Sequence, residues 1–262
     1  MHSAPLRQSS AATAADGFST KDIGVDLAYV QWTATEDLTL FAGKMKNPLY
    51  RAGGAPLIWD GDLNPEGFAA TFESGNFFAT GGAFSAEERS SADDSLLYAA
   101  QAGMNFAVGE GYTDTVGNSP FYDGSANGNT VDIEGNYVFE YRNTELFAQY
   151  DTSVNDWPLR VFVHATQNNE ISQEDTAYAF GAKLGSAKKQ GSSEYSWTYQ
   201  DIEADAVIGT FNDSDFGGGG TDSSGHILKA KYMLRDRIGL GGTLFLNDVD
   251  RFQGVEHDYS RI

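Results

Sequence analysis

The feature that most constrains the fold of this chain is a series of short segments with alternating apolar and polar residues. In "DIGVDLAYVQW" (22–32), for example, Ile23, Val25 and Leu27 occupy every second position. A period of two puts successive side chains on opposite faces of a strand, whereas a helix needs a period near 3.6. Clusters of Gly, Asn, Asp and Ser separate the segments, as turns do. About 13 strands are predicted, at 22–32, 38–46, 66–74, 77–85, 95–108, 111–116, 143–151, 158–166, 176–186, 193–202, 225–235, 238–248 and 256–262.

The links between these segments alternate in length along the whole chain. Short links, such as 75–76 and 236–237, follow one strand, and long links, such as 47–65 and 203–224, follow the next. Short turns on one rim and long loops on the other are typical of outer-membrane β-barrels, whose tilted strands need about 9–11 residues. A soluble sandwich or propeller could hold as many strands, but no internal repeat supports a propeller. The pattern predicts an all-β, antiparallel transmembrane β-barrel.

Composition excludes several other classes of protein. The chain has 17 Lys and Arg against 37 Asp and Glu, a net charge of -20. Nucleic acid needs a basic surface, so no nucleic-acid partner is expected, whereas cations would be attracted. There is no Cys, hence neither a disulfide framework nor a thiolate metal site. No apolar run approaches the ~18 residues of a membrane-spanning helix.

Several long stretches resemble a known family. They include "DGFSTKDIGVDLAYVQW", "LTLFAGKMKNPLY", "PLIWDGDLNPEGFAATF", "PLRVFVHATQN" and "LGGTLFLNDVDR", in the order in which the family has them. The chain is similar to the putative porin family of Gram-negative outer membranes over most of 16–262. This resemblance implies a pore in the bacterial outer membrane for small hydrophilic solutes or ions, surrounded by the lipid bilayer and lipopolysaccharide. General porins are often trimers, so a homotrimer is among the implied partners.

The resemblance also suggests how the barrel is organised. Residues 1–20 are expected to be a flexible segment that belongs to a loop, and 21–262 a porin-type barrel. Family members have further strands before the first one here and a complete last strand, whereas "YSRI" stops part-way. We therefore expect strands from a barrel of about 16, incomplete or open, because single-chain bacterial barrels usually have an even number.

One long link is a candidate filter. If three strands are missing, 47–65 joins the fifth and sixth strands, and in general porins that loop folds inward and narrows the channel. A constriction with opposed charges sorts solutes by size and charge. The alternative is a solvated external loop. The candidate constriction residues are the bases Lys44, Lys46 and Arg51, the aromatic Trp59, and the acids Asp60, Asp62 and Glu66.

Alternation also predicts which charged side chains point into the pore. A charge on the lipid face costs ~2–4 kcal/mol at mid-depth, so charged residues opposite an apolar face should point inward. Some of them could instead lie at the rim, where exposure costs almost nothing. The predicted pore-lining residues are Arg160, His164, Lys183, Lys229, Lys231 and Arg235.

The remaining acidic stretches carry no recognisable site. The acids between 201 and 224, and those between 110 and 134, lack the spacing of a calcium-binding loop, so both stretches are expected to be external and solvated. The four His are far apart, and no nucleophile or phosphate motif occurs. We therefore expect no enzyme activity, no metal and no cofactor. Two rival hypotheses remain: a soluble β-rich binding or adhesion module, and a barrel that anchors without conducting.

Overall fold

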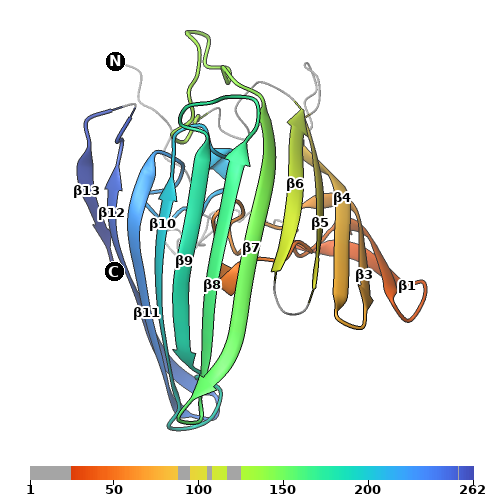
Figure 1. Ribbon diagram of the computed structural model, residues 1–262, viewed down its shortest axis with the longest axis vertical. Coiled ribbons are helices and arrows are strands. Elements are labelled where there is room, and N and C mark those ends of the chain that lie inside the picture. The colour runs from red at the N-terminus through yellow and green to blue at the C-terminus, as the bar shows by residue number, and fades with distance from the viewer. Residues whose placement is uncertain (1–24, 88–94, 105–107, 117–124, 253) are drawn as a thin grey trace, which may run out of the picture.

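The computed structural model describes residues 25–87, 95–104, 108–116, 125–252 and 254–262. Residues 1–20, the predicted flexible segment, lie outside them. The described chain forms a single antiparallel sheet in which each strand pairs with the next along the chain (Figure 1). Its 13 strands are β1 Ala28–Thr33, β2 Leu38–Lys44, β3 Glu66–Ser74, β4 Phe77–Glu87, β5 Ser95–Met104, β6 Val108–Val116, β7 Tyr141–Val154, β8 Trp157–Asn168, β9 Thr176–Gly185, β10 Ser193–Ile202, β11 Ser223–Arg235, β12 Ile238–Val249 and β13 His257–Arg261.

The prediction of an all-β, antiparallel fold of 13 strands is confirmed. The predicted bounds differ from the observed ones most at β1, which begins at Ala28, at β5, which ends at Met104, at β6, which begins at Val108, and at β7, which ends at Val154. Two 3-10 turns, η1 (Ala52–Gly54) and η2 (Gly209–Phe211), lie in the loops after β2 and β10. No helix among the described residues is long and apolar enough to cross a membrane.

The short turns have the backbone geometry that tight hairpins require. β7 and β8 are joined by Asn155 and Asp156, both with positive φ, at 49° and 64°. Two successive residues with positive φ are characteristic of the type I′ turn, whose twist matches that of the flanking strands, and Asn and Asp tolerate that conformation. The β3–β4, β7–β8 and β11–β12 turns lie at the lower end in Figure 1, away from the long loops.

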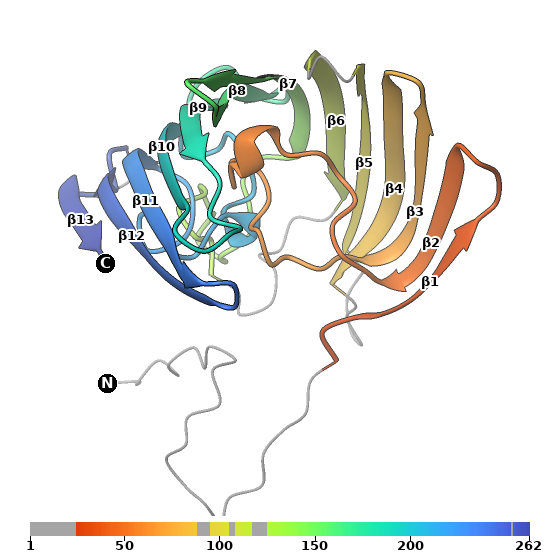
Figure 2. The ribbon, with the colours of Figure 1, turned by 90° about the horizontal axis from the view of Figure 1, so that it is seen from below.

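The sheet curves into an arc that is open on one side. Seen from below, the strands surround a central space, and the chain between β2 and β3 crosses that space (Figure 2). Within the described residues β1 pairs only with β2, and β13 pairs only with β12. The architecture is therefore an open, barrel-like arc with a long loop inside it.

The two faces of the sheet differ in what covers them. On β7 and β8 the inward Phe147 and Phe162 are 2% and 6% exposed, whereas the outward Leu146 and Val163 are 60% and 55% exposed. Loops inside the arc cover the inner face. The outer face presents apolar side chains without any protein cover in the described part of the chain, as expected of a surface that contacts lipid.

Candidate pore constriction

The loop 47–65 between β2 and β3 folds into the arc. Its middle contains η1, and its apolar side chains Leu49, Leu57 and Ile58 are buried. The Tyr50 ring packs against Phe147 of the inner wall, with a distance of 5.2 Å between ring centroids. An external loop would leave these groups in water. The loop therefore forms part of the molecule's interior. We call residues 47–65 the constriction loop.

Glutamine side chains on the wall hold the backbone of the constriction loop. The Tyr50 N–H donates to Gln101 Oε1 at 2.7 Å, and Gln101 Nε2 donates back to the Tyr50 carbonyl at 3.1 Å. The Gly53 N–H donates to Gln149 Oε1 at 2.8 Å. Gln101 and Gln149 come from β5 and β7, so the loop is fixed to two strands through backbone groups that would otherwise be unsatisfied.

A buried pair of side chains, Glu145 and His164, supports Gln101 in this attachment. Gln101 also donates to Glu145, whose second oxygen lies 2.7 Å from His164 Nε2. Glu145 and His164 are each 2% exposed. His164 points inward, as alternation suggests, but it lies beneath the constriction loop and not on an open passage. The chain His164–Glu145–Gln101 thus links β8, β7 and β5 to the loop.

A second loop packs on the first. The loop 203–222 between β10 and β11 is not the external, solvated segment that its acids suggested. Phe211 stacks on Trp59 with 5.7 Å between ring centroids, and the Asp60 N–H donates to the Phe211 carbonyl at 2.7 Å. Asn212 Nδ2 donates to the Leu57 carbonyl at 2.7 Å. The two loops therefore form one inner layer.

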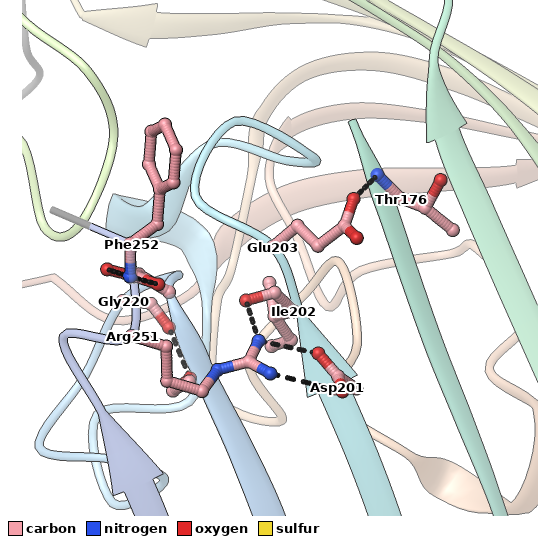
Figure 3. A network of polar contacts seen from close by, with 9 residues as sticks. Thr176, Asp201, Ile202, Glu203, Gly220, Arg251 and Phe252 are labelled. Atoms are coloured by element: carbon pink, nitrogen blue, oxygen red, sulfur yellow. Dashed lines mark hydrogen bonds and ion pairs between the residues drawn. The ribbon is translucent and has the colours of Figure 1, made fainter. Parts of the chain in front are cut away.

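Polar side chains fix the stem of this second loop. Asp205 is buried and accepts hydrogen bonds from the Thr130 N–H at 2.8 Å and from the Tyr141 hydroxyl at 2.9 Å. Near the end of β10, the Arg251 guanidinium donates to Asp201 at 2.6 Å, and Glu203 accepts from the Thr176 N–H at 2.8 Å (Figure 3). Several of the acids that looked like solvated loop charges are therefore structural acceptors.

Four aspartates lie close enough to interact where the two loops meet: Asp60, Asp62, Asp213 and Asp215. The pKa of Asp60 is raised to about 6, chiefly by burial and in addition by the neighbouring Asp213 and Asp62. Burial also raises the pKa of Asp213. We call this group the acidic cluster.

The bases predicted to face these acids mostly have other contacts. Lys44 Nζ donates to the Asn64 carbonyl at 3.2 Å, and Lys46 is exposed. Arg51 lies nearest, with Nη1 3.5 Å from the Trp59 carbonyl. Glu66 is the first residue of β3, lies opposite Lys44 in the register and is exposed.

Basic side chains on the inner face of the sheet, which we call the wall, form a row across β8, β9 and β11. In the register of the sheet, Arg160 lies opposite Lys183, Lys183 opposite Ser196, and Ser196 opposite Lys229. Arg160 binds Asp151 through two hydrogen bonds of 2.6 and 2.9 Å, and Lys183 lies 3.0 Å from Glu194.

The last two predicted lining residues continue along β11. Lys231 follows two positions after Lys229 on the same side of the strand, and Arg235 lies at the short-turn end. A cavity of about 640 Å³ separates part of this wall from the constriction loop, and Lys183, Lys229 and Lys231 line it. Whether these residues line a conducting pore stays a prediction.

A family model described as "Putative porin" matches residues 2–124 and 122–249. The chain belongs to this putative porin family. Among curated proteins no match was found. Among solved structures, Pseudomonas aeruginosa OccD3 (OpdP) is similar with a TM-score of 0.43 at 12% identity, over 79% of this chain and 53% of that chain. The chain thus spans about half the length of the OccD3 chain.

The residues that shape the inner layer of this porin-family chain were largely missed by sequence reasoning. In "SLLYAAQAGM", Leu97, Ala99 and Gln101 occupy every second position and so lie on the same, inward face of the strand. A polar Gln101 among these apolar residues could have indicated a buried polar contact. Glu145 and Gln149 show the same pattern on β7. The partners of these side chains depend on where the loop docks, which alternation does not specify.

Proposed function

We propose that this protein is a channel of the bacterial outer membrane through which small hydrophilic solutes and ions diffuse passively. Membership of the putative porin family supports a porin-like role. The outward apolar side chains support a lipid environment, with the bilayer and lipopolysaccharide as surroundings. A homotrimer remains an expectation from the family resemblance.

The observation that carries the proposal is the docked constriction loop. Gln101 and Gln149 hold it inside the arc, where it reduces the space enclosed by the strands. On one side the acidic cluster is concentrated at the junction of the two loops, and on the other the wall carries Arg160, Lys183 and Lys229. Opposed charges across a narrow passage produce a transverse field, which would select solutes by charge as well as by size.

Conductance in planar lipid bilayers tests this function. We expect discrete current steps from the detergent-folded protein. Replacing residues 48–63 by a short Gly-Ser linker should enlarge each step, because the loop no longer obstructs the passage. Folded protein that inserts but passes no current would indicate an anchor. A protein that is monodisperse in plain buffer would favour the soluble binding or adhesion module.

A further inference from the structure

The outer face of β10, β11 and β12 carries a groove of about 670 Å³ with a largely apolar lining. These three strands are neighbours in the sheet (Figure 1). The lining side chains point away from the arc, because Leu228 is 39% exposed whereas the adjacent Ile227 is 2% exposed. The groove therefore faces the surroundings of the protein. Its large side chains are Leu184, Tyr195, Trp197, Leu228 and Leu244.

The floor of the groove consists of small residues between these larger ones. Ala230 lies opposite Gly242 in the register of β11 and β12, and Tyr195 lies opposite Ala230 on the other side. A Cβ at Gly242 would have no atom within 4 Å, so the space above the floor is open. A narrow apolar depression of this kind fits an extended hydrocarbon chain.

The side chains become polar between the groove and the long-loop end of the strands. Along the register, the outward row above the groove is Phe180, Tyr199, His226 and Leu246, and the row beyond it is Tyr178, Asp201, Ser224 and Asp248. Six residues along β12 separate Gly242 from Asp248, which is ~20 Å. On a tilted strand this length spans about half of the ~30 Å hydrocarbon core, as one lipid does.

His226 presents a hydrogen-bond donor at this polar end of the groove. The Trp197 Nε1–H donates to His226 Nδ1 at 3.1 Å, and the two rings stack with 6.0 Å between their centroids. A neutral histidine whose Nδ1 accepts a hydrogen bond carries its proton on Nε2. Because His226 is exposed, the Nε2–H can donate to a group outside the protein.

Asp248 presents an acceptor beside this donor. His226 lies opposite Leu246, two residues from Asp248, so His226 and Asp248 are diagonal neighbours whose Cα atoms are roughly 7–8 Å apart. Asp201, the other acid of that row, is bound by Arg251. Asp248 forms no ion pair with any residue that the structure describes. A donor and an unpaired carboxylate thus lie together at one end of the apolar groove.

We propose that this surface binds one phospholipid with a phosphoethanolamine headgroup. An acyl chain fills the groove, the phosphate accepts from His226 Nε2–H, and the ammonium donates a charge-assisted hydrogen bond to Asp248. A quaternary ammonium has no N–H to donate, and an anionic headgroup without an amine would leave the carboxylate unpaired. The inference rests on the proposed function for its membrane environment and adds a lipid partner of defined chemistry.

Native mass spectrometry of the protein folded in detergent tests the headgroup. The probes are phosphatidylethanolamine, phosphatidylcholine and phosphatidylglycerol with identical oleoyl chains. We expect one phosphatidylethanolamine per chain, retained at least about threefold more than either other lipid. His226→Phe and Asp248→Asn should each remove this preference. Equal retention of the three lipids by wild type would overturn the proposal. Displacement by an equal molar amount of lipopolysaccharide would assign the groove to that glycolipid and would also overturn it.

Two glycine variants separate the groove from the rest of the outer face. Gly242→Leu fills the groove, whereas Gly81→Leu puts the same side chain on the outward face of β4, where a Cβ has no atom closer than 3.9 Å. Neither glycine has a positive φ, so neither change strains the backbone. Gly242→Leu should lower retention of phosphatidylethanolamine at least about threefold, and Gly81→Leu should leave it unchanged. Equal effects of the two variants would contradict a site in the groove.

Lipid retention needs no conductance, so failure of this site can be distinguished from failure of the channel function. Selective retention that Gly242→Leu abolishes supports the site even if wild type passes no current, an outcome that would contradict only the channel function. Wild type that conducts but retains no lipid selectively would overturn the site and leave the channel function standing.

Discussion

Asp60 shows how one residue can couple pH to the docking of the two loops. Its pKa in the folded protein is about 6, above the usual 3.8, chiefly because it is buried, with further contributions from Asp213 and Asp62. A carboxyl group with a raised pKa binds its proton more tightly in the folded than in the unfolded state. The free energy of unfolding therefore rises as the pH falls from about 6 toward 3.8. At pH 7 the carboxyl group is ionised, and its buried charge lowers the free energy of unfolding.

The variant Asp60→Asn tests this coupling. It removes the buried charge, so we expect it to be more stable than wild type at pH 7 and to show a flatter pH dependence between about 4 and 6. Urea unfolding in micelles at several pH values measures both effects. Asp156→Asn, in the exposed β7–β8 turn, serves as the control. A variant curve parallel to that of wild type would show that Asp60 is not the coupling group.

Glu145 is the residue on which the attachment of the constriction loop depends. It is buried between His164 and Gln101 and contacts both. Glu145→Ala leaves two buried polar side chains without this partner, which typically costs about 1–3 kcal/mol. We expect a lower unfolding midpoint and noisier single-channel current, because Gln101 loses its support. Leu146→Ala, on the outward face of β7, should change the current noise far less.

At the scale of elements, the constriction loop requires a glycine where it meets the wall. Gly53 has a φ of 64°, and a Cβ there would lie 2.1 Å from the Phe162 ring. Gly54 has a similar φ of 73°, but a Cβ there would have no atom within 4 Å. Both positions favour glycine for backbone reasons, and only Gly53 does so also for lack of space.

This pair provides a matched comparison. Gly53→Ala and Gly54→Ala introduce comparable backbone strain, so the difference between them reports the contact with Phe162. We expect Gly53→Ala to displace the loop from β8, with larger current steps and faster proteolysis within 47–65. Gly54→Ala should show only a modest loss of stability, of about 1 kcal/mol. If the two variants behave alike, the approach of the loop to Phe162 does not control the passage.

The strands were far easier to predict than the layer inside them. A strand such as β10 is specified by its own residues, because alternation over ten positions is a local property, and its predicted and observed bounds coincide. The docking of 203–222 depends on Trp59, Leu57 and Thr130, which are distant in sequence. Acids such as Asp205 therefore looked like solvent-exposed loop charges although they are buried acceptors.

The basic row was only partly predictable for a related reason. Alternation identifies the side of a strand on which Lys183 and Lys229 project, but not which of them an acid neutralises. Glu194 pairs with Lys183 although Lys231 is its direct neighbour in register, and that choice depends on side-chain geometry. Which of these ammonium groups forms an ion pair therefore emerges only from the three-dimensional arrangement.

At the scale of the whole molecule, the outer face of the sheet differs from that of a soluble sheet protein, because its exposed side chains are apolar. Buried polar side chains such as Gln101, Glu145 and Asp205 lie on or inside the arc, while Leu146 and Tyr150, 60% and 64% exposed, face outward. In water that outer surface would remain exposed, and β1 and β13 would present backbone groups unpaired within the described chain. Both features promote association between copies.

We therefore expect the fold to form in detergent or lipid and not in plain buffer. Refolded in detergent, the protein should show a strong β-sheet signal in circular dichroism and a gel band whose migration changes on heating. In buffer the same preparation should aggregate, because nothing replaces lipid on the outer face. A compact, monodisperse sheet protein in buffer would contradict both the membrane environment and the channel built on it. Aggregation in both media would instead indicate that the unpaired edges of β1 and β13 cause the association, since unpaired backbone groups are costly in a bilayer as well.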